Sequence, residues 1–252
     1  MMIVKELFLY VKKNRDIKGD FMIGIIGAMQ EEIAELLKYM KVENKIKRLE
    51  YLFYEGLIND HQVVLLQGGI GKVNAAIATT LMLTHYDIDY VINIGSAGGL
   101  HLNQNVGDVV ISNKVAHHDV DLTVFGKEYG QISDLPLYFE PDSELLELVQ
   151  KVLDKQERTS HIGLIVSGDQ FISKKEQVDL IKSHFPEAVC SEMEAATVAH
   201  VCHVFQKKFI ITRSLSDIYN KGDNAIQFDE YLKKASQASA QMCYDLIRRL
   251  PQ

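Results

Sequence analysis

Short apolar runs along the chain are separated by stretches in which apolar residues recur with helical spacing. The runs predict strands at residues 22–28, 89–95, 108–118, 160–169, 188–192 and 209–217. Several of them, such as VINIG and FIITR, are almost continuously apolar, which is typical of parallel strands buried on both faces. The alternation predicts an α/β fold, a three-layer αβα sandwich around a central mixed and twisted sheet.

The segments between these runs predict helices and one hairpin. Residues 50–58 and 61–68 flank Asn59-Asp60, a pair that is common in tight turns. Helices are expected at 30–41, 72–86, 141–153, 194–205 and 228–250. Residues 119–140 show neither pattern. An irregular segment of this length in a compact domain is usually functional or part of an interface.

The sequence predicts one domain preceded by a short N-terminal segment. No repeat, low-complexity stretch or linker divides residues 22–252, which we expect to form a single domain. Residues 1–21 precede the first convincing strand. We interpret them as an N-terminal extension that arises from an upstream start, with Met22 as the physiological start. The alternative is a short, loosely attached helix.

Composition narrows the class of protein. The 252 residues are 47% hydrophobic and 24% charged, as in ordinary globular proteins. A net charge of −7 argues against a nucleic-acid partner, and the apolar runs are too short to span a membrane. Cys190, Cys202 and Cys243 lie far apart in apolar runs. We therefore expect buried, reduced thiols in a cytoplasmic protein rather than disulfides or zinc ligands.

Polar motifs follow several of the apolar runs. Ser191-Glu192-Met193-Glu194 stands where a strand turns into a helix, and carboxylates are stable at a helix start. Similar positions are occupied by GAMQEE (27–32), GIGK (69–72), GSAGG (95–99), SGDQFI (167–172) and RSLSD (213–217). Ligands bind beyond the carboxyl ends of strands in α/β sheets. The motifs therefore predict one shared site.

In this order, the motifs resemble those of the nucleoside phosphorylase/hydrolase superfamily, and most closely its bacterial 5′-methylthioadenosine/S-adenosylhomocysteine nucleosidases. The resemblance covers roughly residues 22–250. It implies a nucleoside phosphorylase-like fold. It also implies hydrolysis of 5′-methylthioadenosine, S-adenosylhomocysteine and 5′-deoxyadenosine to adenine and the ribose product, in methionine salvage, with no cofactor and no metal.

Cleavage of a purine N-glycosidic bond needs an acid for the departing base, polar groups for the ribose and a base for the attacking water. The resemblance implies that Asp217 is the acid, that Glu32 activates water and that Glu194 accepts hydrogen bonds from the ribose hydroxyls. Taken alone, Asp217 would be a turn or cap residue and Glu32 a solvated residue near a helix start. These roles therefore depend on the resemblance.

The resemblance also implies a set of substrate-binding residues. Phe171 would stack on adenine and the Ile172 backbone would contact its edge, although such a pair alone is more often part of a core. The remaining positions are Met29, Ile70, Ser96, Gly98, Glu192, Met193, Ser216, Phe228 and Phe125. Phe125 lies in HHDVDLTVFGKEYGQISDLP, which resembles a segment that a neighbouring subunit contributes. We expect a homodimer with residues 119–135 near the partner's site.

Two other functions remain open. A phosphate-dependent purine nucleoside phosphorylase would need cations for phosphate, and members of that branch carry arginine where this chain has Asn93. Glu32 and Asn93 therefore favour water over phosphate. A catalytically silent nucleoside-binding protein is the other alternative. The presence of all three carboxylates argues against it.

Overall fold

The computed structural model describes residues 21–221 and 224–250; the predicted extension therefore lies outside this part of the chain except for Phe21. Its elements, in chain order, are β1 (Met22–Gly27), α2 (Gln30–Leu37), β2 (Lys41–Arg48), β3 (Tyr51–Ile58), β4 (His61–Gln67), α3 (Lys72–His85), β5 (Tyr90–Asn93), β6 (Ser96–Gly99), β7 (Val109–His117), η1 (Thr123–Phe125), α4 (Ser143–Lys155), β8 (Ser160–Ser167), α5 (Lys175–His184), β9 (Ala188–Glu192), α6 (Ala195–Phe205), β10 (Lys208–Ile218) and α7 (Asn224–Ile247).

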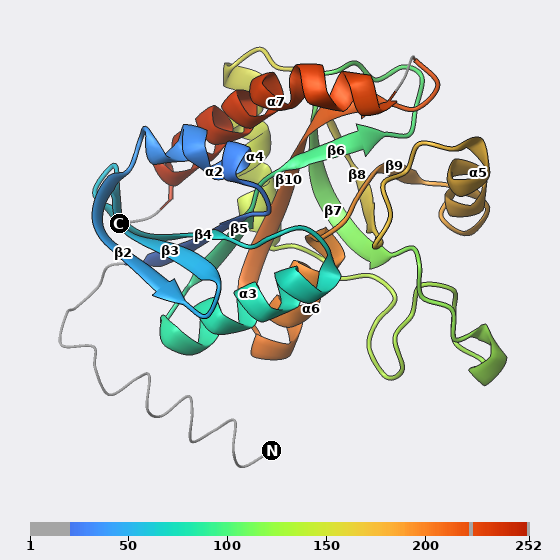
Figure 1. The fold of residues 1–252 in the computed structure, drawn as a ribbon, viewed down its shortest axis with the longest axis horizontal. Helices are drawn as coiled ribbons and strands as arrows, with labels where there is room; N and C mark the ends of the chain where they lie inside the picture. The colour runs from blue at the N-terminus through green and yellow to red at the C-terminus, as the bar shows by residue number, and fades with distance from the viewer. Residues whose placement is uncertain (1–20, 222–223, 251–252) are drawn as a thin grey trace.

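One mixed sheet joins the strands of the described residues. Its order is β2-β3-β4-β1-β5-β10-β6-β9-β8-β7. β1 lies parallel to β4 and β5, whereas β2, β3 and β4 form an antiparallel meander. Helices α2, α4 and α7 cover one face, and α3 and α6 cover the other (Figure 1). The predicted three-layer α/β architecture with a mixed sheet is confirmed.

Strand β10 closes part of this sheet, a feature that the sequence pattern does not predict. Its first residues pair in parallel with β5, and its later residues pair in parallel with β6. Between them, residues 212–214 also pair antiparallel with β7. The half of the sheet that contains β6, β9, β8 and β7 thus returns to β10. Pairing between distant strands leaves no local periodicity in the sequence.

Two strands differ from the sequence-based expectation. Strand β2 was not predicted because Val42 and Ile46 are its only apolar residues, and it forms a charged edge of the sheet. Ser96–Gly99, which follows the predicted strand at 89–95 and has no strand pattern of its own, is strand β6. It packs so closely against β10 that a Cβ at Gly99 would lie 2.6 Å from Ile218 Cδ1. Glycine permits this approach because it has no side chain.

Two large apolar clusters hold the layers together. One lies under α3 and α6 and includes Ala78, Met82 and Val198; the other lies under α2, α4 and α7 and includes Leu36 and Leu246. Strand β1 contributes to both, as expected for a strand buried on both faces. None of the described helices has the combination of length and apolar character that crossing a membrane requires.

Candidate active site

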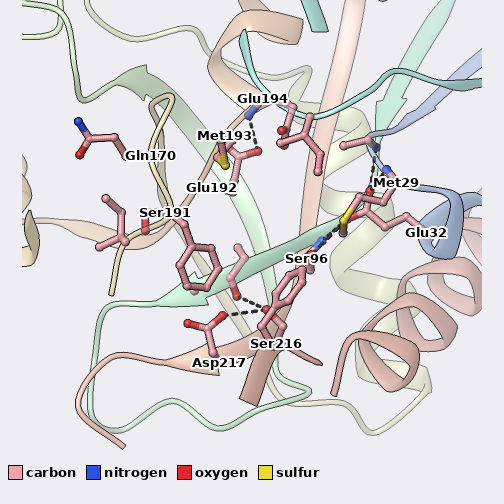
Figure 2. Close-up of a pocket in the computed structure, with 17 residues that line it drawn as sticks. Met29, Glu32, Ser96, Gln170, Ser191, Glu192, Met193, Glu194, Ser216 and Asp217 are labelled. Carbon is pink, nitrogen blue, oxygen red and sulfur yellow. Dashed lines mark hydrogen bonds between the residues drawn. The ribbon is translucent and has the colours of Figure 1, made fainter. Parts of the chain in front are cut away.

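A cavity lies at the carboxyl ends of β1, β8, β9 and β10, and strand β6 and the start of α7 complete its wall (Figure 2). All predicted site residues except Phe125 line it. The lining residues are Ala28, Met29, Glu32, Ile70, Ser96, Ala97, Gly98, Gln170, Phe171, Ile172, Ser191, Glu192, Met193, Glu194, Ser216, Asp217 and Phe228. The chain therefore brings together motifs that are up to about two hundred residues apart in sequence.

Glu32 is held in the first turn of α2, directly after β1. It is 3% exposed. Its Oε2 accepts hydrogen bonds from the backbone N–H groups of Ala28 (2.7 Å) and Met29 (3.1 Å), and Oε1 accepts from Ser96 N (3.0 Å) and Ser96 Oγ (3.2 Å). Burial raises the pKa of Glu32, although the positive charge of Arg213 and these backbone bonds oppose the shift. A carboxylate with a raised pKa is a stronger base.

Asp217 stands near the end of β10, where a bulge interrupts the pairing with β6. Its side chain is buried. Oδ1 accepts a hydrogen bond from Ser216 Oγ (2.9 Å), and Oδ2 accepts one from Asn224 Nδ2 (2.6 Å) at the start of α7. Burial raises the pKa of Asp217, and the bonds from Asn224 and Ser216 oppose the shift. The bulge thus directs the Asp217 carboxyl into the cavity. Because its pKa is raised, this carboxyl retains its proton to higher pH than an exposed aspartate.

Glu194 immediately precedes α6, and its Oε1 accepts a hydrogen bond from the backbone N–H of Gly71 (2.7 Å). Burial, followed by the negative charge of Glu192, raises the pKa of Glu194. The neighbouring Glu192 has a different environment. Its carboxylate accepts bonds from Ala195 N, Glu194 N and Ser167 Oγ and pairs with Arg213 Nη2 at 2.6 Å.

Arg213 is the principal charged group that the sequence analysis did not assign. It is 2% exposed in the middle of β10. Each N–H of its guanidinium has an acceptor: Nε and Nη2 donate to Glu192, Nη2 donates to Asn93 Oδ1, and Nη1 donates to the carbonyls of Asn93 and Thr212. A single arginine inside the apolar run FIITR is a signal that could have identified it, because a buried charge needs a partner.

The other missed residues that line the cavity lie beside predicted ones. Ala28, Ala97, Gln170 and Ser191 line the cavity as immediate neighbours of Met29, Ser96 and Gly98, Phe171, and Glu192 in their motifs. Adjacency to a predicted residue was their only sequence signal.

The open end of the cavity is aromatic. The rings of Phe171 and Phe228 meet edge to face, with centroids 5.8 Å apart. Phe171 is 45% exposed, whereas Ile172 is buried. Phe125 lies elsewhere, 76% exposed on η1, and does not contribute to the cavity of its own chain. The expectation for Phe125 therefore concerns a second subunit only.

Comparison with known proteins identifies the family to which this fold belongs. Residues 22–248 match the sequence profile of the phosphorylase superfamily. The 5′-methylthioadenosine/S-adenosylhomocysteine nucleosidase of Staphylococcus haemolyticus is 48% identical over 229 residues, which are 91% of this chain and 100% of that protein. The chain belongs to the 5′-methylthioadenosine/S-adenosylhomocysteine nucleosidase family of this superfamily.

Solved structures agree with this placement. The Neisseria meningitidis nucleosidase of the same name, in complex with methylthio-immucillin-A, superimposes with a TM-score of 0.88 at 41% identity, covering 91% of this chain and 99% of that one. The futalosine hydrolase of Helicobacter pylori has a TM-score of 0.87 at 31% identity, covering 91% and 98%. The predicted family is confirmed.

Proposed function

We propose that this protein hydrolyses the N-glycosidic bond of 5′-methylthioadenosine, S-adenosylhomocysteine and 5′-deoxyadenosine, and releases adenine and the ribose product. The observation that carries the proposal is that Glu32 on α2, Glu194 at the N-cap of α6 and Asp217 on β10 enter one cavity. The nucleosidase names of relatives with 45–48% identity support it.

The acid step belongs to Asp217. As the bond between the sugar carbon and the purine nitrogen breaks, its electron pair moves into the base, and a proton from Asp217 neutralises the charge on the imidazole ring. Ser216 Oγ and Asn224 Nδ2 then stabilise the carboxylate that remains, because both already donate to it.

The two glutamates serve the ribose and the attacking water: Glu194 binds the ribose, and Glu32 activates the water. Glu194 accepts hydrogen bonds from the ribose hydroxyls, and its oxygen atoms face positive charge as it develops on the sugar. Glu32 takes a proton from the water whose oxygen bonds to the sugar carbon. Arg213 keeps a positive charge beside Glu32, which favours the ionised form that can act as the base.

The positions and partners of the cationic side chains near the cavity favour hydrolysis over phosphorolysis. No lysine or arginine is among the residues that line it in the described part of the chain. The nearby Arg213 donates every N–H to Glu192, Asn93 and Thr212. Phosphate would have to displace these bonds, because a phosphate dianion needs charged donors of its own.

The test is product chromatography after incubation with 5′-methylthioadenosine, S-adenosylhomocysteine, 5′-deoxyadenosine, futalosine and inosine, each with and without phosphate. We expect adenine from the first three, at the same rate in both buffers. A rate that requires phosphate would reject hydrolysis in favour of the phosphorylase alternative. Turnover of futalosine alone would move the protein to the other hydrolase activity among its structural neighbours.

We also propose a homodimer in which residues 119–135 approach the partner's site. Exposed apolar side chains support this: Val73 (69%) on α3, Val204 (61%) on α6, and Val124 (83%) and Phe125 (76%) on the irregular segment. Helices α3 and α6 lie side by side, and the segment extends from the same side of the molecule (Figure 1). A cytoplasmic location and a role in methionine salvage complete the proposal; the three buried, unpaired cysteines support the location.

A further inference from the structure

Three charged residues outside the mechanism form a closed ring of contacts beside the cavity. Lys72 Nζ lies 2.5 Å from Asp119 Oδ1. The backbone N–H of Asp169 donates to Asp119 Oδ2 at 2.9 Å, and the backbone N–H of Lys72 donates to Asp169 Oδ1 at 2.7 Å. The ring joins the start of α3, the start of the irregular segment and the loop after β8.

The Lys72–Asp119 pair is shielded from solvent. The two side chains are only 21% and 20% exposed. Burial alone would raise the pKa of Asp119, but the bonds from Lys72 and Asp169 hold it below its ordinary value. Lys114 and Glu187 form a pair of equal length elsewhere, but their side chains are 26% and 52% exposed, and Lys114 Nζ also lies 4.4 Å from the centroid of the Tyr138 ring. Pairs with such exposure contribute little to stability.

The ring fixes the loop that carries Phe171 relative to the start of α3, which in turn contacts Glu194. Asp169 immediately precedes Gln170, Phe171 and Ile172, which line the cavity. It also caps α3, because Gly71 at the N-cap has no side chain of its own for this purpose. The backbone N–H of the preceding residue, Gly71, donates to Glu194 Oε1. One helix start thus binds both the loop that carries Phe171 and the carboxylate assigned to the ribose.

We infer that Lys72 is a positioning residue: through Asp119 and Asp169 it fixes the Phe171 loop over the adenine end of the cavity, at a set distance from Glu194. The inference rests on the proposed function, because the adenine end is defined by it. Lys72 touches no reacting atom in this assignment. Its loss should therefore weaken the binding of the base without changing the proton transfers.

The experiment is Lys72→Met, with affinity for adenine measured by calorimetry and steady-state kinetics measured with 5′-methylthioadenosine. We expect the Kd for adenine and the KM to rise about tenfold, which corresponds to about 1.4 kcal/mol. The kcat and its pH profile should stay as in the wild type, and Lys72→Arg should retain most of the affinity. Lys114→Met is the matched control and should change neither constant.

Asp119→Asn provides a second route in case Lys72→Met folds poorly, and the double variant tests whether the pair acts as a unit. Each single variant and the double variant should lose the same affinity for adenine. Unchanged adenine affinity in both single variants would overturn the inference, as would a fall in kcat with Kd and KM unchanged. Because adenine binding is measured without turnover, a wild type that fails to hydrolyse 5′-methylthioadenosine would contradict only the proposed function.

Discussion

Glu32 and Asp217 are both buried carboxyl groups, but their hydrogen-bond partners differ. Glu32 accepts from three backbone N–H groups and one hydroxyl and is further stabilised as an anion by Arg213. Asp217 accepts from two side chains, and no cation contributes to its pKa. Glu32 therefore has more donors that stabilise its charged form, although burial raises the pKa of both groups. This contrast in donors supports the proposed roles of Glu32 as the base and Asp217 as the acid.

The assignment predicts the behaviour of two isosteric variants. Glu32→Gln and Asp217→Asn should lower kcat by about 10²–10⁴, the usual contribution of a general acid or base. Both should still bind adenine nucleosides, because shape and most hydrogen bonds persist. Calorimetry with a nucleoside and single-turnover rates measure the two effects separately. Retention of wild-type turnover in either variant would show that the residue has been given the wrong role.

The bond from Asn224 to Asp217 predicts a change in pH dependence. In the proposed mechanism Asp217 must carry its proton, so kcat/KM should fall as pH rises through the pKa of Asp217. Asn224→Ala removes a donor that stabilises the charged form, which should raise this pKa further and move the alkaline limb of the profile to higher pH. Gln227 fastens the same turn to Ile218 N and to the Lys221 carbonyl without touching the carboxylate. Gln227→Ala should therefore leave that limb in place; an equal shift in both variants would exclude a direct effect of Asn224.

Single residues also show where sequence reasoning ends. Glu32, Glu194 and Asp217 stand in recognisable motifs, so their convergence on one cavity could be anticipated. The pairing of Arg213 with Glu192 and Asn93 could not, because these residues come from three different strands and no motif links them. Their contact depends on the strand order of the sheet.

At the scale of secondary-structure elements, prediction succeeded where periodicity is strong. The hairpin of β3 and β4 turns at Asn59 and Asp60, both with positive φ, as the dipeptide indicated. Prediction failed where composition conceals the strand. β2 is mostly charged, and β6 is half glycine. In both cases tertiary pairing overrides weak local preference.

The start of α4 permits a quantitative test of an element's stability. Asp142, the N-cap of this helix, accepts bonds from the backbone N–H groups of Glu144 and Leu145 and pairs with Lys208 at 2.9 Å. Asp142→Ala should reduce the free energy of unfolding by about 1 kcal/mol. Asp142→Asn keeps an oxygen for the cap and should lose less. Urea titrations of the two variants separate the cap from the ion pair, and equal losses would assign the effect to the ion pair.

At the scale of the whole molecule, the proposed dimer predicts that Phe125, which does not line the cavity of its own chain, affects substrate binding in the partner's cavity. Phe125→Ser should raise the KM for 5′-methylthioadenosine about tenfold by removing apolar contact with the 5′ substituent in the partner's cavity. The kcat and the affinity for free adenine should change little. Leu102, 61% exposed, offers the control Leu102→Ser. Sedimentation should show a dimer for both variants, and a wild-type monomer with an unaffected Phe125→Ser variant would refute the shared site.

Strand β10 carries both Arg213 and Asp217 and has partners on both edges. The distance between Arg213, which lies beside the proposed base Glu32, and the proposed acid Asp217 is therefore set by the backbone of one paired strand. The loop after β8, by contrast, is held by side-chain contacts such as that between Asp169 N and Asp119 Oδ2 rather than by strand pairing. This division explains how one scaffold can serve hydrolases with different nucleoside substituents, such as the nucleosidases and the futalosine hydrolase that share this fold. New specificity can evolve at the ends while the centre of bond cleavage stays intact.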